Sequence, residues 1–255
     1  MKNRWTLKSK KALVTGATRG IGRAITDEFL ELGAEVFIIS RSQKDVDKMV
    51  KLYKGKSFKI SGIECDVSDK SERENLFKKI KKDWGRLDIL VNNAGTNTRK
   101  KTLENSEEDF DKLMNLNMDS VFDLCKKFHP LLKRSGKGSI VNITSVAGII
   151  TVGTGSPYAM TKAAVNHLTR YLSVEWAEDK IRVNAVAPWY IKTSLTMPVL
   201  KDPVKLKAVL DRTPMKRIGE PEEVAAVAAF LSMDAASFIT GEVIAADGGF
   251  LKYGL

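Results

Sequence analysis

A strand, a glycine-rich turn, a helix and a second strand follow one another within residues 11–40. Residues 11–15 (K-A-L-V-T) favour a short strand, and the turn T-G-A-T-R-G-I-G occupies residues 15–22. Apolar side chains at helical spacing then fill residues 21–32, and residues 35–40 (E-V-F-I-I-S) favour the second strand. Because a strand–helix–strand crossover of about 30 residues joins parallel neighbours, this segment predicts a parallel sheet.

The same alternation of strand and helix continues to the end of the chain. The further expected strands are 58–65, 87–91, 139–144, 182–187 and 242–246, and the further expected helices are 44–53, 70–84, 107–133, 157–177 and 224–233. No internal repeat and no linker rich in proline, glycine or serine interrupts this order. We therefore expect one doubly wound α/β domain of Rossmann type over residues 1–255, with a seven-stranded, mainly parallel sheet and helices on both faces.

Residues 189–214 do not fit the alternation. They contain three prolines among scattered apolar residues, which predicts one or two short helices in a long excursion. The segment follows the end of strand 182–187, and open α/β sheets bind ligands at the carboxyl ends of their strands. Long irregular segments in compact domains are often lids, so we expect a substrate flap here.

Composition limits the classes of function. Charged residues make up 29% of the chain and the net charge is +11, but the lysines are spread without aromatic interleaving or a DNA-binding motif. A basic rim that attracts phosphate-bearing ligands therefore fits better than nucleic-acid binding. No apolar run suits a membrane helix or a secretory signal, and Cys65 and Cys125 have no metal or redox spacing. We expect a cytoplasmic protein with reduced core thiols, no metal, no nucleic-acid partner and no membrane attachment.

The turn after the first strand carries three glycines in the pattern G-x3-G-x-G. Between a first strand and its helix, such a turn lets a pyrophosphate approach the backbone and the helix N-terminus. This context favours dinucleotide binding over a merely structural turn. The residues expected to hold the cofactor here are Gly16, Thr18, Arg19, Gly20, Ile21 and Gly22.

The end of the second strand indicates which dinucleotide binds. An acidic residue there would bind a ribose 2′-hydroxyl, but this chain has Ser40 and Arg41, and Arg19 stands in the turn. Two guanidinium groups able to converge on one phosphate favour NADP(H), the alternative being that both face solvent. Further cofactor contacts are expected after the third and fourth strands, from Asp66, Val67, Asn93, Ala94 and Gly95.

A serine, a tyrosine and a lysine stand close together near the middle of the chain. Ser156 and Pro157 favour a helix start, which places Tyr158 in the first turn and Lys162 one turn later on the same face. The lysine ammonium and the positive helix N-terminus should lower the pKa of the Tyr158 phenol. Ser145, at the end of a strand, could add a hydroxyl donor. The same spacing also occurs in ordinary surface helices.

Together these motifs resemble the short-chain dehydrogenase/reductase family. T-G-x3-G-x-G, N-N-A-G, a serine at the end of the fifth strand and Y-x3-K follow in the family's order over residues 11–249. The segments R-W-x-L, L-V-T-G-A-T-R-G-I-G and P-W-Y-I-K-T-S-L are most similar to the tropinone-reductase-like group. Members of that group need not reduce tropinone.

The resemblance implies specific catalytic roles. Tyr158 is then the general acid that protonates a carbonyl oxygen as hydride arrives, and the base in the reverse direction. Lys162 lowers the tyrosine pKa and binds the nicotinamide ribose, while Ser145 holds the substrate oxygen. Asn117 kinks its helix and completes a water-linked proton relay to Lys162, with Asn115 as the nearby competitor for that role.

The resemblance also implies a nicotinamide-binding segment after the sixth strand. The residues of that segment are Pro188, Trp189, Ile191 and Thr193. Many members have glycine where this chain has Trp189, so the indole either narrows the nicotinamide pocket or faces the flap. The apolar tail at residues 250–255 could cover the flap or join an interface. Family members pair through helices matching 107–133 and 157–177, which implies a homodimer or homotetramer.

The leading hypothesis is an NADP(H)-dependent oxidoreductase that interconverts a ketone and a secondary alcohol. Small residues at 151–156 leave room near Tyr158, and the flap residues Tyr190, Leu195, Met197, Val199 and Leu200 favour an apolar or cyclic ketone. A 3-oxoacyl carrier-protein reductase is the first alternative, because the basic residues 99–101 near the mouth could dock an acidic carrier. Sugar or polyol oxidation is a third option. A catalytically silent NADP(H) sensor is an alternative of another class, although such proteins typically lose the tyrosine or the lysine.

Overall fold

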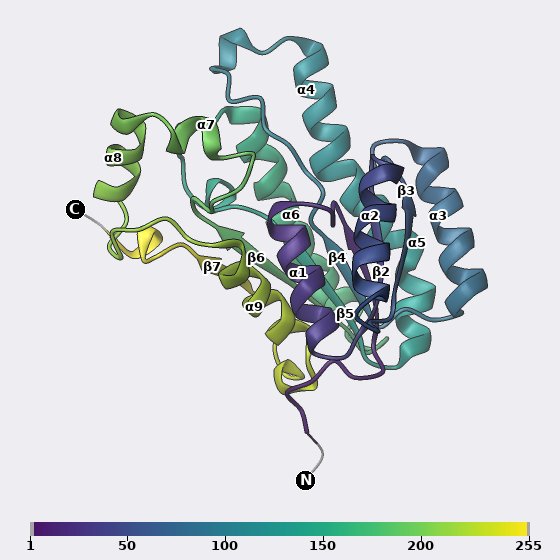
Figure 1. Ribbon diagram of the computed structural model, residues 1–255. Helices are drawn as coiled ribbons and strands as arrows, with labels where there is room; N and C mark the ends of the chain where they lie inside the picture. The colour runs from purple at the N-terminus through teal and green to yellow at the C-terminus, as the bar shows by residue number, and fades with distance from the viewer. Residues whose placement is uncertain (1–2, 254–255) are drawn as a thin grey trace.

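A seven-stranded sheet runs through the middle of the molecule, which a computed structural model describes over residues 3–253 (Figure 1). All its neighbouring strands are parallel, in the order β3-β2-β1-β4-β5-β6-β7. The strands are β1 (Lys11–Thr15), β2 (Glu35–Ser40), β3 (Ile60–Glu64), β4 (Ile89–Asn92), β5 (Gly138–Ile143), β6 (Ile181–Pro188) and β7 (Val243–Ala246). The expected Rossmann-type fold class is therefore confirmed, with a sheet that is parallel throughout.

Helices connect these strands and cover both faces of the sheet. They are α1 (Gly20–Glu31), α2 (Gln43–Lys54), α3 (Lys70–Trp84), α4 (Glu107–Met114), α5 (Ser120–Ser135), α6 (Ser156–Glu175), α7 (Met197–Leu200), α8 (Pro203–Asp211) and α9 (Pro221–Ser232). Several ends follow local capping rules. The Asp69 carboxylate accepts the first free N–H groups of α3, and Gly85 ends that helix in the left-handed conformation.

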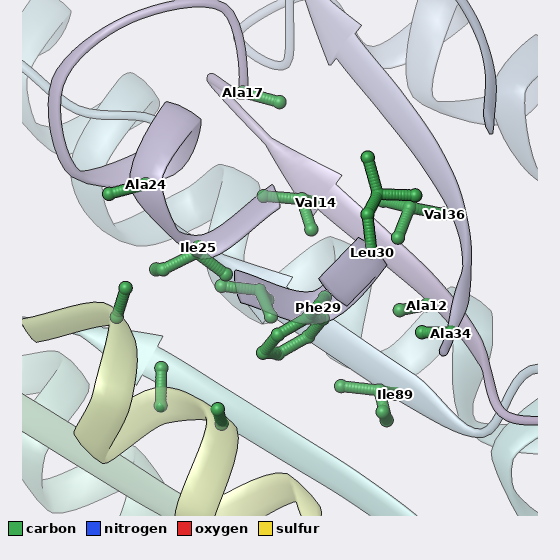
Figure 2. Packing of buried hydrophobic residues seen from close by; sticks show 14 of the residues in the cluster. Ala12, Val14, Ala17, Ala24, Ile25, Phe29, Leu30, Ala34, Val36 and Ile89 are labelled. Atoms are coloured by element: carbon green, nitrogen blue, oxygen red, sulfur yellow. The ribbon is translucent and has the colours of Figure 1, made fainter. Parts of the chain in front are cut away.

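Alternating side chains of the strands build a separate core on each face. In β1, Val14 packs in the cluster under α1 and α9, whereas Leu13 packs in the cluster under α3, α5 and α6. Figure 2 shows the first cluster, where Phe29 of α1 lies between its helix and the sheet near Ile89. Phe29 is fully buried, and burial of such a side chain stabilises the fold by about 1.5–3 kcal/mol.

The single helix expected over residues 107–133 is wrong. A π-helical turn at Asn115–Asp119 divides it into α4 and α5. Asn117 is fully buried in that turn; its Oδ1 accepts from the Thr96 N–H and its Nδ2 donates to the Thr96 carbonyl, both at 2.9 Å. These bonds hold a widened turn against the segment after β4. The apolar spacing continues through the turn, so it does not reveal the break, whereas the family resemblance implied a kink at Asn117.

The topology leaves room for a ligand at the carboxyl ends of the strands. β1 lies between β2 and β4, so the chain crosses in opposite directions from this central strand, and such switch points form clefts at the carboxyl ends. The excursion at residues 189–214 contains α7 and α8, as expected, and lies with α4 toward one end of the molecule (Figure 1). Within residues 3–253, no helix combines the length and apolar character needed to cross a bilayer.

Both cysteines are buried free thiols. Burial raises the pKa of Cys65 and of Cys125 to about 12, so both are protonated at neutral pH. In the described part of the chain, no cluster of three or more His, Cys, Asp or Glu side chains is arranged to hold a metal ion.

Candidate active site

A cleft of about 790 Å³ extends along the carboxyl ends of β1 to β6. It brings together almost all the residues that the sequence singles out. Those lining it are Gly16, Thr18, Arg19, Gly20, Ile21, Ser40, Arg41, Asp66, Val67, Asn93, Ala94, Gly95, Ser145, Tyr158, Lys162, Pro188, Trp189, Ile191 and Thr193. Gly22 and Asn117 do not line the cleft and instead support residues that do.

The glycine-rich turn is packed so tightly that side chains cannot replace its glycines. Gly16 and Gly20 have positive φ angles of 62° and 54°. A Cβ on Gly22 would lie 2.3 Å from the Gly16 carbonyl oxygen and 2.4 Å from Asn93 Nδ2. That amide donates to the carbonyls of Thr15 and Gly16 at 2.8 and 3.1 Å, which ties the turn to the end of β4. The result is a backbone cradle that opens at the N-terminus of α1, the geometry that suits a pyrophosphate.

We expect Gly22→Ala to destabilise the protein by roughly 1–3 kcal/mol, because the added methyl group must displace backbone atoms. Denaturant unfolding measures this, and calorimetry should show weaker NADP(H) binding by the same variant. Gly55→Ala is the matched control, since a Cβ there meets only ordinary contacts at 3.4 Å or more. Equal stability of the two variants would contradict the steric account of the turn.

The corner beside β2 is positively charged. Arg19 and Arg41 are exposed at the cleft, and among residues 3–253 neither forms an ion pair with a carboxylate. The extended backbone of Arg19 directly precedes α1, so its side chain stands beside the cradle. Asp45, which belongs to none of the sequence motifs, also lines this corner from the first turn of α2.

The wall after β3 is held by its own hydrogen bonds. The Asp66 carboxylate accepts from the Ser68 N–H at 2.9 Å and the Ser68 hydroxyl at 2.7 Å. The Val67 carbonyl accepts from the buried guanidinium of Arg73, which also pairs with Asp123. Asp66 and Val67 therefore form a fixed wall rather than a mobile loop.

The start of α6 differs from the expected one. Ser156 is not the cap: the residue before the helix is Gly155, with a φ of 103°, and Ser156 is already helical. A Cβ on Gly155 would lie 3.0 Å from the Lys100 carbonyl oxygen. The Ser156 hydroxyl lies 2.9 Å from the Thr102 hydroxyl, so both residues join α6 to the segment that follows β4. Tyr158 still falls in the first turn of α6.

Ser145, Tyr158 and Lys162 converge in the cleft. The Lys162 ammonium lies 5.7 Å from the centre of the Tyr158 ring and donates to the Ile143 carbonyl at 3.0 Å. Lys162 is only 6% exposed, although it is a cation. Ser145 follows β5, and its hydroxyl accepts from the Ala147 N–H at 3.1 Å. The same hydroxyl acts on the Tyr158 phenol and lowers its pKa.

The expected lowering of the Tyr158 pKa is wrong in this structure. Burial of the phenol raises its pKa, and this outweighs the Ser145 hydrogen bond and the positive charge of Arg99, which both lower it. Burial also lowers the pKa of Lys162 to about 8. Desolvation, which cannot be read from the spacing of two residues, therefore decides the sign. It leaves Tyr158 protonated at neutral pH.

Asn117 stands behind Lys162, whereas Asn115 does not. A Cβ on Gly95 would lie 3.1 Å from Asn117 Oδ1 and 3.6 Å from Lys162 Nζ, so both side chains approach the same glycine. The side chain of Asn115 instead donates to the Ser68 carbonyl at 3.2 Å. Of the two asparagines, the structure brings only Asn117 next to the lysine.

Trp189 lines the cleft but is anchored away from it. Its ring stacks on Phe250 with centroids 3.8 Å apart, and its Nε1 donates to the Thr213 hydroxyl at 3.1 Å. The indole thus joins the segment that follows β6 to the end of the excursion at residues 189–214 and to the C-terminal tail. Residues 254–255 of that tail lie outside the described residues.

The walls around Tyr158 are more polar than the sequence suggests. Tyr190 and Leu195 line the cleft, but Met197, Val199 and Leu200 do not. Asn97, Arg99 and Thr154 line it instead. The signal in the sequence for these three residues is their position: Asn97 and Arg99 closely follow N-N-A-G, and Thr154 closely precedes Tyr158.

The basic residues 99–101 do not form one docking patch. Arg99 lines the cleft, whereas Lys100 forms an ion pair with Asp109 of α4. Arg99 therefore belongs to the cleft, and the charge of Lys100 is balanced by Asp109.

Known proteins resemble this chain over nearly its whole length. A family model described as Enoyl-(Acyl carrier protein) reductase matches residues 16–251. A tropinone reductase homolog of Arabidopsis thaliana, At5g06060, is 50% identical over 252 residues, covering 98% of this chain and 96% of the relative. A tropinone reductase homolog of Datura stramonium is 45% identical over 255 residues, covering 98% of this chain and 95% of the relative.

Solved structures share the fold at lower identity. A gluconate 5-dehydrogenase from Burkholderia cenocepacia, in complex with NADP and tartrate, superposes with a TM-score of 0.94 at 31% identity, covering 98% of each chain. The RhlG/NADP active-site complex of Pseudomonas aeruginosa superposes with a TM-score of 0.90 at 37% identity, covering 98% of this chain and 99% of that one.

Proposed function

Because this chain belongs to the short-chain dehydrogenase/reductase family of oxidoreductases, we propose that it reduces a ketone to a secondary alcohol with NADPH and catalyses the reverse oxidation. One observation carries the proposal: Ser145, Tyr158 and Lys162 share a single cleft with the glycine cradle. The relatives named as tropinone reductase homologs support a ketone as the substrate. Val152, Tyr190 and Leu195, which line the cleft, support an apolar or cyclic ketone.

The residues present fit a nicotinamide dinucleotide. The cradle has no room for a Cβ at Gly22 and opens at a helix N-terminus, which favours a pyrophosphate. Arg19 and Arg41 would hold the 2′-phosphate of NADP(H), and the segment from Pro188 to Thr193 faces the turn across the cleft. A Cβ on Gly20 would lie 3.3 Å from Thr193 Cγ2, which shows how closely these two walls approach.

The cofactor supplies the hydride when bound, and the protein supplies orientation and a proton. In the proposed mechanism the Tyr158 hydroxyl donates its proton to the carbonyl oxygen of the substrate. The raised pKa of Tyr158 keeps that proton available at neutral pH. Ser145 holds the same oxygen, and the Lys162 ammonium stabilises the phenolate that forms. Asn117 would complete a proton path behind Lys162.

Arg41→Asp should shift the preference from NADP(H) toward NAD(H), because a carboxylate repels the 2′-phosphate and binds a 2′-hydroxyl. We expect the ratio of the two binding constants to change roughly 10–100-fold, the size of one hydrogen-bonded charge contact. Calorimetry with each cofactor measures it. Lys44→Asp makes the same charge change at an exposed position outside the cleft and controls for general electrostatics. An unchanged ratio in Arg41→Asp would remove Arg41 from the phosphate site.

NADPH consumption with a panel of ketones, sugars and 3-oxoacyl thioesters tests the activity. We expect ketones to be reduced faster than 3-oxoacyl carrier protein, since Lys100 is paired with Asp109 rather than free for docking. Binding of NADPH without turnover of any carbonyl compound would favour the sensor instead.

We also propose that residues 189–214 act as a flap of a single catalytic domain, and that the chain forms a homodimer or homotetramer. The support for self-association is a group of exposed large apolar side chains on α5 and α6. They are Phe122, Met160, Tyr171 and Val174, exposed by 52%, 52%, 63% and 79%. Apolar surface of this kind favours burial against a partner.

A further inference from the structure

We propose that the substrate carries a negatively charged group, a carboxylate, which Arg99 binds while the carbonyl lies at Tyr158. This inference rests on the proposed function and narrows its substrate class to an oxo acid and the corresponding hydroxy acid. Arg99 is therefore assigned as the specificity-determining residue of the cleft.

The backbone places Arg99 at the end of the cleft that contains Tyr158, where we propose that the substrate binds. A Cβ on Gly155, three residues before Tyr158, would lie 3.8 Å from the Arg99 Cα. Arg99 has a φ of 54°, a strained angle for a residue with a side chain, and Asn97 Oδ1 holds it by accepting its N–H at 2.9 Å. Asn97 in turn donates to the Thr154 hydroxyl at 2.6 Å. The loop after β4 is thus fastened to the loop before α6. Of the charged residues at that junction, Arg99 lines the cleft and Lys100 does not.

The guanidinium has donors to spare for an anion. It donates to the Leu195 carbonyl at 3.1 Å and lies 6.0 Å from the centre of the Tyr190 ring. A guanidinium carries five N–H donors, and two parallel ones can bind a carboxylate. Among residues 3–253, no Asp or Glu pairs with Arg99, although the neighbouring Lys100 has Asp109.

The distribution of charged side chains along the cleft also favours an anion beside Tyr158. The carboxylates lining it, Asp45 and Asp66, follow β2 and β3, far along the sheet from the strands β5 and β6 that carry the substrate end. Arg99 and Lys162 are the charged residues on the walls around Tyr158. The positive charge of Arg99 acts on the Tyr158 phenol, which agrees with this placement. An anionic substrate therefore meets positive charge without a competing carboxylate.

A matched pair of substrates isolates the charge: 4-oxocyclohexanecarboxylate and its methyl ester. We expect wild type to prefer the acid in kcat/KM, and Arg99→Gln to reduce the acid-to-ester ratio by about tenfold or more. Arg99→Lys should give an intermediate ratio, because it keeps the charge and loses the planar fork. Lys100→Gln, which changes the adjacent charge outside the cleft, should keep the wild-type ratio.

A binding measurement separates this inference from the proposed reaction. Calorimetry with cyclohexanecarboxylate in the presence of NADP⁺ should show about tenfold weaker binding by Arg99→Gln than by wild type, with cyclohexanecarboxamide as the neutral control. If neither ketone is reduced but carboxylate binding still depends on Arg99, the ketone-reductase proposal fails and the anion site stands. If Arg99→Gln lowers acid and ester by the same factor and binds the carboxylate as wild type does, Arg99 only supports Leu195 and the anion site is refuted.

Discussion

Replacement of Tyr158 by phenylalanine is expected to slow NADPH-dependent ketone reduction by roughly 10²–10⁴-fold, the usual contribution of a general acid. Phenylalanine fills the same space and keeps the first turn of α6, so only the proton donor is removed. The raised pKa of Tyr158 means that the lost group is a protonated phenol at neutral pH. NADPH binding should remain, because the cradle of Gly16, Gly20 and Gly22 is held by Asn93 and is unchanged in this variant.

Steady-state rates and cofactor fluorescence measure these two effects separately. Tyr171→Phe is the matched control, since Tyr171 lies in the same helix with 63% of its surface exposed. We expect that variant to keep wild-type rates. Similar rates in Tyr158→Phe and wild type would show that another group delivers the proton.

Lys162→Met is expected to abolish turnover and yet to raise the free energy of unfolding. The Lys162 pKa of about 8, against 10.5 in an unfolded chain, means that its burial costs roughly 3 kcal/mol at pH 7, where both states are protonated. Loss of the hydrogen bond to the Ile143 carbonyl offsets about 1 kcal/mol of the gain. A net stabilisation of roughly 2 kcal/mol follows, and turnover is lost because the variant lacks the ammonium that we propose stabilises the Tyr158 phenolate.

The sign of the pH dependence provides a further check on Lys162. Between pH 8 and 10.5 the folded lysine is neutral while the unfolded one still binds a proton, so wild type gains stability as the pH rises through this window. The advantage of Lys162→Met should therefore shrink to near zero at about pH 10. Chemical denaturation at pH 7 and pH 10 measures this, with the exposed Lys126→Met as control. A constant difference, or destabilisation at pH 7, would contradict the cost assigned to the buried ammonium.

Much of the fold follows from local patterns in the sequence. Strand and helix periods alternate clearly enough to predict a parallel sheet, and the order of motifs places them on one edge of it. The break at Asn117 escaped the pattern, because apolar residues keep their spacing through the π turn while a buried side chain bonds Thr96. The start of α6 also depends on a contact with a distant segment, so the expected serine cap at Ser156 is wrong. Gly155, not a serine cap, is required by the approach of the Lys100 carbonyl.

The parts of the site that local motifs form, such as the glycine-rich turn, could be predicted from the sequence. The parts that depend on contacts between residues far apart in the sequence could not. Trp189 and Phe250 are 61 positions apart, and their stacking has no local signal. The contact of Arg99 with Leu195 spans 96 positions and turns an apparent surface cation into part of the cleft. The pKa of Tyr158 depends on burial by the whole fold, which is why charge spacing alone gave the wrong direction.

Deuterium transfer tests most directly whether this cleft transfers hydride from NADPH to a ketone. The protein is incubated with NADPH deuterated at both C4 positions and a ketone panel that includes the oxo acid described above, and the products are analysed by mass spectrometry. We predict a secondary alcohol that carries one deuterium at the former carbonyl carbon, formed in equal amount with NADP⁺. Bound NADPH with no deuterated alcohol from any ketone would contradict hydride transfer in this cleft.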